Sequence, residues 1–385
     1  MTRIMFITTG LYFDPMDTAT RLRYDTLSSA GYSGITLCVV YDRTLKNSHI
    51  GNFSLISLYL PRFLQGYGSI RGILRAFYYF GFCIWKGHSH RQQYDVSIGT
   101  DPFKTGFLCY LLFRLTKKPY IVEVAGNYIR SFSVNERNSG FLSKLKQRYV
   151  KSVSPFVLER AAAVKLLYES QIDGLATLSD ASKINVFHDI TAYDQFHKSN
   201  IDNKFILSVG HPWHLKGMDV LIKAFNLIQD RIPGYRLHIV GYSPDIDEFE
   251  KLAAGNPYII LDNKGLPFEE VASLFMSCSL FVLASRTEAM GRVLLEAMAS
   301  GKPVIASNID GIPRIVRHDY NGLLFETENV DELAHKMLAL LNDREHTDRL
   351  IKAGLRSIQD QFSCESFIRH YQSMVSNAAK NALQN

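Results

Sequence analysis

Short β-rich runs alternate with helical patterns along the chain. In the C-terminal half five such runs follow one another: Phe205–Gly210, Leu237–Gly241, Tyr258–Leu261, Leu280–Ala284 and Pro303–Ala306. Helical patterns separate them, as at Asp219–Ile228, Phe268–Ser277 and Gly291–Ser300. The N-terminal half has similar runs at Ile4–Thr8, Ile35–Val40, Tyr94–Gly99 and Tyr120–Val124. Strands that alternate with helices form βαβ units, so the sequence predicts an α/β fold with parallel sheets.

Length and charge divide the chain into two parts. Its 385 residues correspond to about two domains of roughly 100–200 residues each. A polar stretch near 190–203 marks the junction, so we expect an N-terminal Rossmann-like domain over 1–198, a second over 199–365, and a final helix, 366–385, that returns to the first domain. Residues 1–198 hold 24 Lys and Arg against 14 Asp and Glu, a net +10, whereas residues 199–385 hold 19 against 23, a net −4. This asymmetry predicts two domains with different partners.

Several classes of protein are disfavoured. The five cysteines are widely spaced and form no CxxC, which favours buried free thiols over disulfides or a zinc site. The chain starts without a signal-peptide pattern, and no apolar stretch reaches the ~18 residues that span a bilayer. We therefore expect a cytoplasmic protein, peripheral on the cytoplasmic face of the membrane. No nucleic-acid-binding motif is present, and no G-x-G-x-x-G follows the first strand, which disfavours a dinucleotide oxidoreductase.

Two segments depart from the α/β pattern. Ser69–Lys86 is apolar on nearly every face, rich in aromatic residues and flanked by cations. Such a segment suits a membrane interface, but a buried helix with ordinary flanking charges explains it equally well. In Phe141–Val153, apolar residues such as Leu145 and Tyr149 recur at helical spacing, with Lys144 and Arg148 on the opposite side. Alone, it is typical of a docked helix with a solvated basic face. Together the two segments favour a membrane-facing surface.

The segment from Leu280 onward reads as a strand, a loop and a helix. Gly291 and the first helical amides form a potential phosphate site, because a helix start has unpaired N–H groups and a positive dipole end. Glu288 lies in the loop before this helix, and Glu296 lies on its second turn. A carboxylate at either position would repel phosphate, but it can accept hydrogen bonds from the hydroxyl groups of a sugar.

The same segment resembles a known family signature. Glu288 and Glu296, separated by seven residues and followed by GKPVIAS, resemble the E-x7-E motif of glycosyltransferase family 4. Phe205–Phe225, which contains Lys216-Gly217, and Leu237–Pro244 are similar to preceding parts of that family in the same order. The resemblance implies the GT-B fold, in which two Rossmann-like domains face a central cleft.

The resemblance also implies a reaction and a set of site residues. The activity would be retaining transfer from a UDP- or GDP-sugar, with Glu288 and Lys216 as the catalytic residues. Glu288 would contact the donor sugar, Lys216 would neutralise the diphosphate, and Glu296 would bind the ribose. The remaining donor-binding residues would be His211, Leu266, Met290, Gly291, Arg292 and Val293. Gly10, Asn127 and Arg130 would lie on the acceptor side. We expect no metal and no other cofactor, because lysine and helix amides would stabilise the leaving group.

The sequence departs from the family at several positions. His211 stands where the family usually has arginine, and Ala125 stands where it often has histidine. The basic, aromatic N-terminal half predicts a glycan acceptor, linked to a lipid such as polyprenyl phosphate, at an anionic membrane surface. The expected function is therefore sugar transfer in cell-surface polysaccharide biosynthesis. A nucleotide-sugar epimerase-type enzyme on the same fold and a non-catalytic membrane-associated partner protein remain alternatives.

Overall fold

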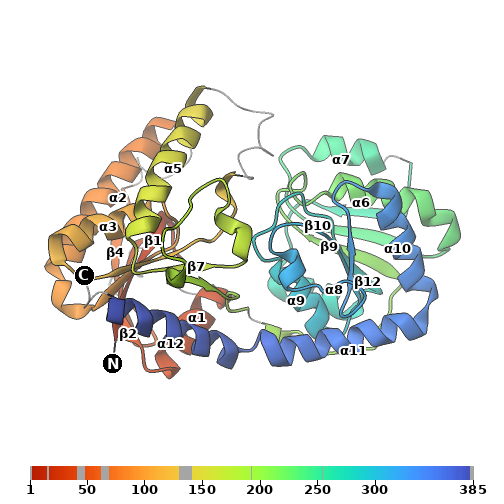
Figure 1. Ribbon diagram of the computed structural model, residues 1–385. Helices are drawn as coiled ribbons and strands as arrows, with labels where there is room; N and C mark the ends of the chain where they lie inside the picture. Colours follow the sequence, from red (N-terminus) through yellow and green to blue (C-terminus); the bar gives the residue numbers. More distant parts are fainter. Residues whose placement is uncertain are drawn as a thin grey trace. The chain divides into compact units, whose positions relative to one another are not determined.

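The computed structural model describes residues 2–14, 17–40, 48–61, 69–129, 141–191, 193–253 and 255–381. These residues form two compact units (Figure 1). The N-terminal unit contains the described residues up to 129, residues 141–190 and residues 364–381. The C-terminal unit contains the described residues from 191 to 363. Helix α12 (Cys364–Asn381), the last of the chain, is therefore part of the N-terminal unit.

The N-terminal unit is built on one sheet whose strands run in the order β3-β4-β2-β1-β5-β6-β7-β8. Its strands are β1 (Arg3–Tyr12), β2 (Ser33–Val40), β3 (His49–Ile50), β4 (Phe53–Tyr59), β5 (Val96–Gly99), β6 (Tyr120–Glu123), β7 (Ala163–Leu166) and β8 (Ile184–Val186). Only the short edge strand β3 pairs in antiparallel fashion, and the other described pairs are parallel. The chain builds outward from β1 to β2 and β4, then returns to add β5 on the other side of β1. The order of the strands therefore reverses between β1 and β5.

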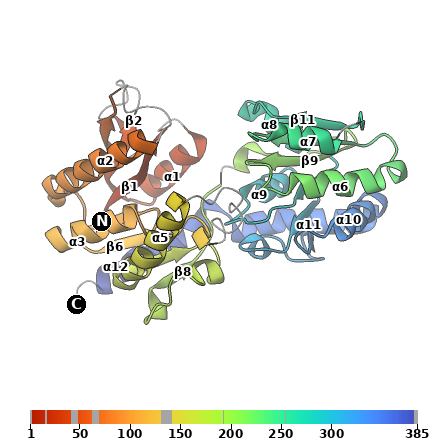
Figure 2. The same ribbon diagram turned by 90° about the horizontal axis from the view of Figure 1, so that it is seen from above.

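Helices cover both faces of this sheet. Helices α2 (Ser69–Ser89), α3 (Thr105–Thr116) and α5 (Phe141–Arg160) lie side by side on one face (Figures 1 and 2). Helices α1 (Thr18–Ser29) and α12 cover the other face, where Tyr24 and Tyr371 join a core with Phe6 and Phe53 of the strands. The amphipathic patterns of these helices thus bury their apolar sides against the apolar faces of the strands.

The C-terminal unit contains a six-stranded sheet in the order β11-β10-β9-β12-β13-β14, and its pairs are all parallel. Its strands are β9 (Phe205–Gly210), β10 (Arg236–Gly241), β11 (Ile259–Asp262), β12 (Leu280–Leu283), β13 (Val304–Ser307) and β14 (Leu323–Phe325). Its helices are α6 (Met218–Ile228), α7 (Ile246–Ala253), α8 (Phe268–Ser277), α9 (Arg292–Ala299), α10 (Val330–Asn342) and α11 (Arg344–Gln361). This is the 3-2-1-4-5-6 order of a doubly wound nucleotide-binding fold. Two α/β units with parallel sheets confirm the fold class predicted from the sequence.

The exposure of helix α2 tests the two interpretations of the segment Ser69–Lys86, which were a membrane-facing segment and a buried helix. Tyr79 and Cys83 are buried against the sheet, but five large apolar side chains of the same helix are 52–74% exposed: Ile73, Leu74, Phe77, Tyr78 and Trp85. The alternative of a fully buried helix is therefore wrong. Among the described residues, no helix has the length and apolar character needed to cross a membrane.

Helix α5 docks on a different side from the one predicted. Leu145 and Tyr149, expected on the docked side, are 54% and 45% exposed. Val150, Val157 and Leu158 are instead fully buried. The helix continues to Arg160, so the window considered in the sequence, which ended at Val153, did not include Val157 and Leu158.

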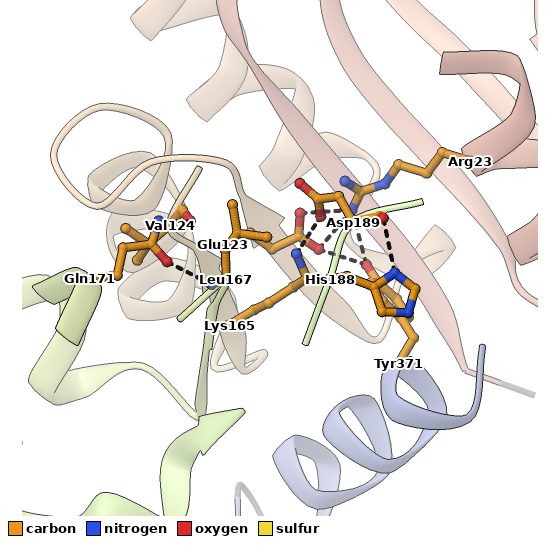
Figure 3. A network of polar contacts seen from close by, with 9 residues as sticks. All are labelled: Arg23, Glu123, Val124, Lys165, Leu167, Gln171, His188, Asp189 and Tyr371. Carbon is orange, nitrogen blue, oxygen red and sulfur yellow. Dashed lines mark hydrogen bonds and ion pairs between the residues drawn. The ribbon is translucent and has the colours of Figure 1, made fainter. Parts of the chain in front are cut away.

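A buried polar network ties α1 and α12 to the strands of the N-terminal unit (Figure 3). Arg23 Nη2 of α1 donates to both carboxylate oxygens of Glu123 at 2.7 and 2.8 Å. The Tyr371 hydroxyl of α12 donates to Glu123 Oε1 at 3.1 Å. On the next strand, Lys165 pairs with Asp189, just before the unit boundary. Glu123 and Lys165 are only 4% and 2% exposed, so this charge pairing is part of the core.

The predicted state of the cysteines is confirmed. Cys38, Cys83, Cys109 and Cys278 are buried free thiols, and Cys364 is half-buried.

Candidate active site

Two loops of the C-terminal unit meet at the carboxyl edge of its sheet. One follows β9 and the other follows β12, and these strands are neighbours at the point where the strand order reverses. Ligands of open α/β sheets bind at such reversal points. Gly217, with φ +64°, allows the contact, because a Cβ there would lie 2.0 Å from the carbonyl oxygen of Ala284. The loops therefore bring residues far apart in sequence to one position.

The two predicted catalytic residues form an ion pair at this position. Lys216 Nζ lies 2.5 Å from Glu288 Oε2, and the two side chains are 20% and 13% exposed. The Ser285 hydroxyl lies 3.3 Å from the same carboxylate oxygen and donates to it. A half-buried lysine and carboxylate thus lie together at the edge where a ligand is expected.

Two further residues position this pair, and sequence reasoning missed both. Asp310 accepts hydrogen bonds from the Glu288 amide at 3.1 Å and from the Thr287 hydroxyl at 2.7 Å. Arg286 makes two 2.8 Å hydrogen bonds to the carboxylate of Asp219. Its amide also donates to the carbonyl oxygen of Leu215 at 2.9 Å. Arg286 therefore joins the two loops. Asp310 follows β13 and Arg286 follows β12. Their location directly after strands is the sequence signal that could have identified them as site residues.

The electrostatics of Asp219 agree with this joining role. Burial by itself raises the pKa of Asp219, but the Arg286 guanidinium outweighs burial and holds that pKa below its usual value. The carboxylate thus remains ionised and paired at neutral pH.

The predicted phosphate-binding segment lies directly beside the ion pair. Helix α9 begins at Arg292, and its N-cap residue Gly291 adopts a left-handed conformation with φ +80°. A Cβ at Gly291 would lie 3.4 Å from the Glu288 side chain. Because glycine has no side-chain oxygen to cap the helix, the first-turn amides remain suited to an anionic ligand. Met290 is buried, Val293 is half-buried and Arg292 is exposed.

Glu296 lies one turn into α9 and is half-buried. Burial raises the pKa of its carboxyl group to about 7, and nearby Arg292 opposes this shift. Its charge therefore changes near neutral pH.

We expect the unfolding free energy of the C-terminal unit to decrease as the pH rises from about 4.5 to 7. In that range the unfolded chain has released the Glu296 proton while the folded chain retains it, so folding is favoured by acid. The shift from 4.5 to about 7 corresponds to roughly 3 kcal/mol. Urea unfolding of wild type and Glu296→Gln at pH 5 and 7.5 measures this difference, with the exposed Glu345→Gln as control. An equal pH dependence in wild type and Glu296→Gln would contradict the expectation.

The other predicted site residues are more dispersed. His211 is exposed directly after β9, and Leu266 is half-buried in the loop between β11 and α8. In the N-terminal unit, Gly10 lies in β1, and Asn127 Nδ2 donates to the Tyr168 hydroxyl at 3.1 Å. Arg130 lies outside the described residues. Across the described ranges, no three His, Cys, Asp or Glu residues are grouped so that they could hold a metal ion.

The C-terminal half matches a known protein family. Residues 189–357 match the family model of glycosyl transferases group 1. An uncharacterized glycosyltransferase of Haemophilus influenzae is 30% identical over 194 residues, 47% of this chain and 55% of that protein. A GDP-mannose-dependent alpha-(1-6)-phosphatidylinositol monomannoside mannosyltransferase of Mycobacterium tuberculosis is 33% identical over 156 residues, 38% of this chain and 40% of that protein. The chain thus spans about half the length of these curated relatives.

A solved structure covers nearly the whole chain. HepE of Anabaena, crystallised in complex with UDP and glucose, matches 98% of this chain and 100% of its own, with a TM-score of 0.72 and 17% sequence identity. At this identity the likeness establishes the fold, which is the predicted GT-B fold. The family model over residues 189–357 and the named glycosyltransferase relatives support the predicted enzyme class, a glycosyltransferase.

Proposed function

We propose that this chain is a retaining glycosyltransferase of family 4. It transfers a sugar from a UDP- or GDP-sugar to a lipid-linked glycan in cell-surface polysaccharide biosynthesis. The observation that carries the proposal is the Lys216–Glu288 ion pair. It lies between β9 and β12, beside the glycine-capped start of α9. This arrangement combines a cation and helix amides for a diphosphate with a carboxylate for a sugar.

Each residue has a role in this proposal. Lys216 and the first-turn amides of α9 compensate the negative charge that grows on the departing diphosphate. His211, exposed after β9, donates a hydrogen bond to the same phosphates. Glu288 accepts hydrogen bonds from the donor sugar, and Glu296 accepts them from the ribose. Leu266 packs on the base, while Met290, Arg292 and Val293 bind through their main chain.

The reaction breaks the bond between the anomeric carbon and the diphosphate oxygen. An acceptor hydroxyl attacks the oxocarbenium-like carbon from the same face, and the departing phosphate oxygen takes its proton. The residues of this chain mainly position the donor and stabilise the charge of the leaving group. This charge balance requires no metal.

The names of similar proteins support the choice of donor. HepE was crystallised with UDP and glucose, and the mycobacterial relative is described as GDP-mannose-dependent. UDP- and GDP-sugars are therefore the donors to test first.

The surface of the N-terminal unit supports an acceptor at an anionic membrane. Helices α2, α3 and α5 together hold nine Lys and Arg but a single acidic residue, Glu159. The same helices expose large apolar side chains, including Phe77 at 74% and Trp85 at 64%. Cations together with exposed aromatic rings suit a membrane interface. Flotation with anionic vesicles measures this association, and an absence of binding at low salt would contradict it.

Thermal unfolding with a set of sugar nucleotides tests the donor assignment. We expect one UDP- or GDP-sugar to raise the melting temperature, because a ligand of the folded state stabilises it by about 2.7 kcal/mol at 100 times its Kd. Incubation of that donor alone then distinguishes transfer from epimerisation, since an epimerase would isomerise the sugar without an acceptor. Stabilisation by no nucleotide would favour the non-catalytic alternative. The anomeric configuration of the product reports retention or inversion.

A further inference from the structure

The N-terminal unit has a pocket at the reversal point of its own sheet. Strands β1 and β5 are neighbours where the strand order reverses. Beside their carboxyl ends lies a cavity of about 250 Å³, enclosed by the end of β1, the first half of α2, the start of α3 and Tyr149 of α5. We call it the switch-point pocket. Since pockets that enclose whole small ligands measure about 300–1,000 Å³, this one suits a segment of a larger ligand.

The wall of the switch-point pocket is mainly apolar. Aromatic and aliphatic side chains dominate it: Tyr79, Phe80, Phe103, Phe107, Leu108 and Tyr149. The hydroxyl groups of the two tyrosines in this wall already have backbone partners. That of Tyr79 donates to the Leu37 carbonyl at 2.9 Å, and that of Tyr149 donates to the Phe103 carbonyl at 2.8 Å. These side chains therefore present mainly ring and methyl surface to a ligand, which favours hydrocarbon.

The described lining of the pocket contains two charged residues, and both are cations. They are Arg75 and Lys104, and none of the described lining residues is acidic. Asp101 lies just before α3, but it is only 4% exposed and accepts hydrogen bonds from the amides of Phe103 and Lys104. Its charge is thus compensated within the loop. An apolar wall with two cations suits a molecule that has a hydrocarbon chain and an anionic head.

We propose that the switch-point pocket binds the lipid phosphate of the acceptor. The first part of the hydrocarbon chain packs on the aromatic wall, and Arg75 and Lys104 bind the phosphate. This inference rests on the proposed function, because it assigns a subsite to the lipid-linked acceptor proposed above. The C-terminal unit has mainly charged groups at its reversal point, whereas the pocket of the N-terminal unit has a mainly apolar wall with two cations. This contrast is what a polar donor and a lipid acceptor require.

Photolabelling of the full chain tests the pocket directly. The probe is farnesyl phosphate with a photoreactive group, used below the concentration at which it aggregates. We expect labelled peptides from the first half of α2 and from residues 103–108. Unlabelled farnesyl phosphate should compete with the probe, and inorganic phosphate should not.

Two glycines of α2 provide a matched pair of variants. Gly72 lines the pocket and Gly81 does not, and a Cβ at either position meets no atom within 4 Å. A side chain can therefore begin at either position without a Cβ clash, but only Gly72→Leu places one beside the pocket. We expect Gly72→Leu to weaken binding of the probe about tenfold or more, because it excludes hydrocarbon from apolar burial. Gly81→Leu should bind as wild type.

Charge variants complete the test. Arg75→Gln with Lys104→Gln should weaken farnesyl phosphate about tenfold while leaving farnesol unchanged, because only the phosphate makes charge-assisted contacts. Equal labelling of Gly72→Leu and wild type would overturn the proposal, as would labelling centred on the exposed Phe77 and Trp85, which would indicate adsorption on the outer face of α2. Nucleotide binding measured on the same samples separates the two proposals. If no nucleotide binds, the proposed function is overturned. The labelling result decides separately whether the switch-point pocket binds the lipid phosphate.

Discussion

Replacing Lys216 by methionine is expected to lower kcat/KM for sugar transfer by roughly 10²–10³-fold, the usual effect of removing one preorganised group that stabilises a leaving or developing anion. Methionine keeps most of the length of the side chain but removes the charge beside Glu288. Because the negative charge of the diphosphate grows as the bond to the sugar breaks, the loss should appear mainly in kcat. Steady-state kinetics with the donor identified by thermal unfolding measure it.

A matched variant distinguishes this role from a general effect of lysine. Lys251 lies exposed on α7 of the same unit, so Lys251→Met should transfer sugar at the wild-type rate. Thermal unfolding of both variants confirms that each is folded. If Lys216→Met retains wild-type kcat/KM while its fold is intact, Lys216 does not stabilise the leaving group and its assignment is wrong.

Replacing Glu123 by alanine is expected to destabilise the N-terminal unit by about 3 kcal/mol or more, because breaking a buried ion pair leaves one charge without compensation. Glu123 is 4% exposed and accepts from both Arg23 and Tyr371. Removing its carboxylate therefore disturbs α1, β6 and α12 together (Figure 3). Because the Arg23 side chain is 21% exposed, water relieves part of the penalty, so we place the effect at the lower end of the range for buried pairs.

Hydrogen exchange resolved by peptide is the appropriate measurement, since a chain of two units need not unfold in a single transition. Peptides of β6, β7 and α12 should lose about two orders of magnitude of protection, while those of the C-terminal unit should not change. Glu365→Ala, an exposed position on α12, should alter protection little. Glu123→Gln should cost less than Glu123→Ala, because an amide oxygen still accepts hydrogen bonds. A loss below 1 kcal/mol for Glu123→Ala would show that the network contributes little to stability.

The sequence predicted most clearly where local patterns and spacing were sufficient. The five runs expected as strands in the C-terminal half are five of the six strands of its sheet. Strand β14, only three residues long, was missed because so short a run has no measurable period. Glu288 and Lys216 were each assigned to the site through the family resemblance, although 72 residues separate them. Arg286 and Asp310 were missed, since their importance depends on partners that only folding brings near.

The helices of the N-terminal unit show the limit of such patterns. From the spacing of apolar residues in a short segment, we expected Leu145 and Tyr149 on the docked side of α5. Docking instead depends on which side of the whole helix fits its neighbours. In the same way, the apolar character of α2 left open whether it is buried or exposed. The composition of a segment shows which side chains are apolar. It does not show how much of the sheet surface is available to bury them.

The amino-acid sequence alone specified two α/β units, the positions of their central strands, the charge difference between them, and the glutamates and lysine of the candidate site. These features follow from local periodicity, turn chemistry and a motif whose members lie close in sequence. The tertiary structure alone decided that Lys216 reaches Glu288, that Arg286 joins their loops, that Glu123 and Arg23 form a buried pair, and that aromatic side chains enclose a pocket beside β1 and β5. Each of these depends on contacts between distant segments, which form only when parallel strands bring their carboxyl ends to one edge of a sheet.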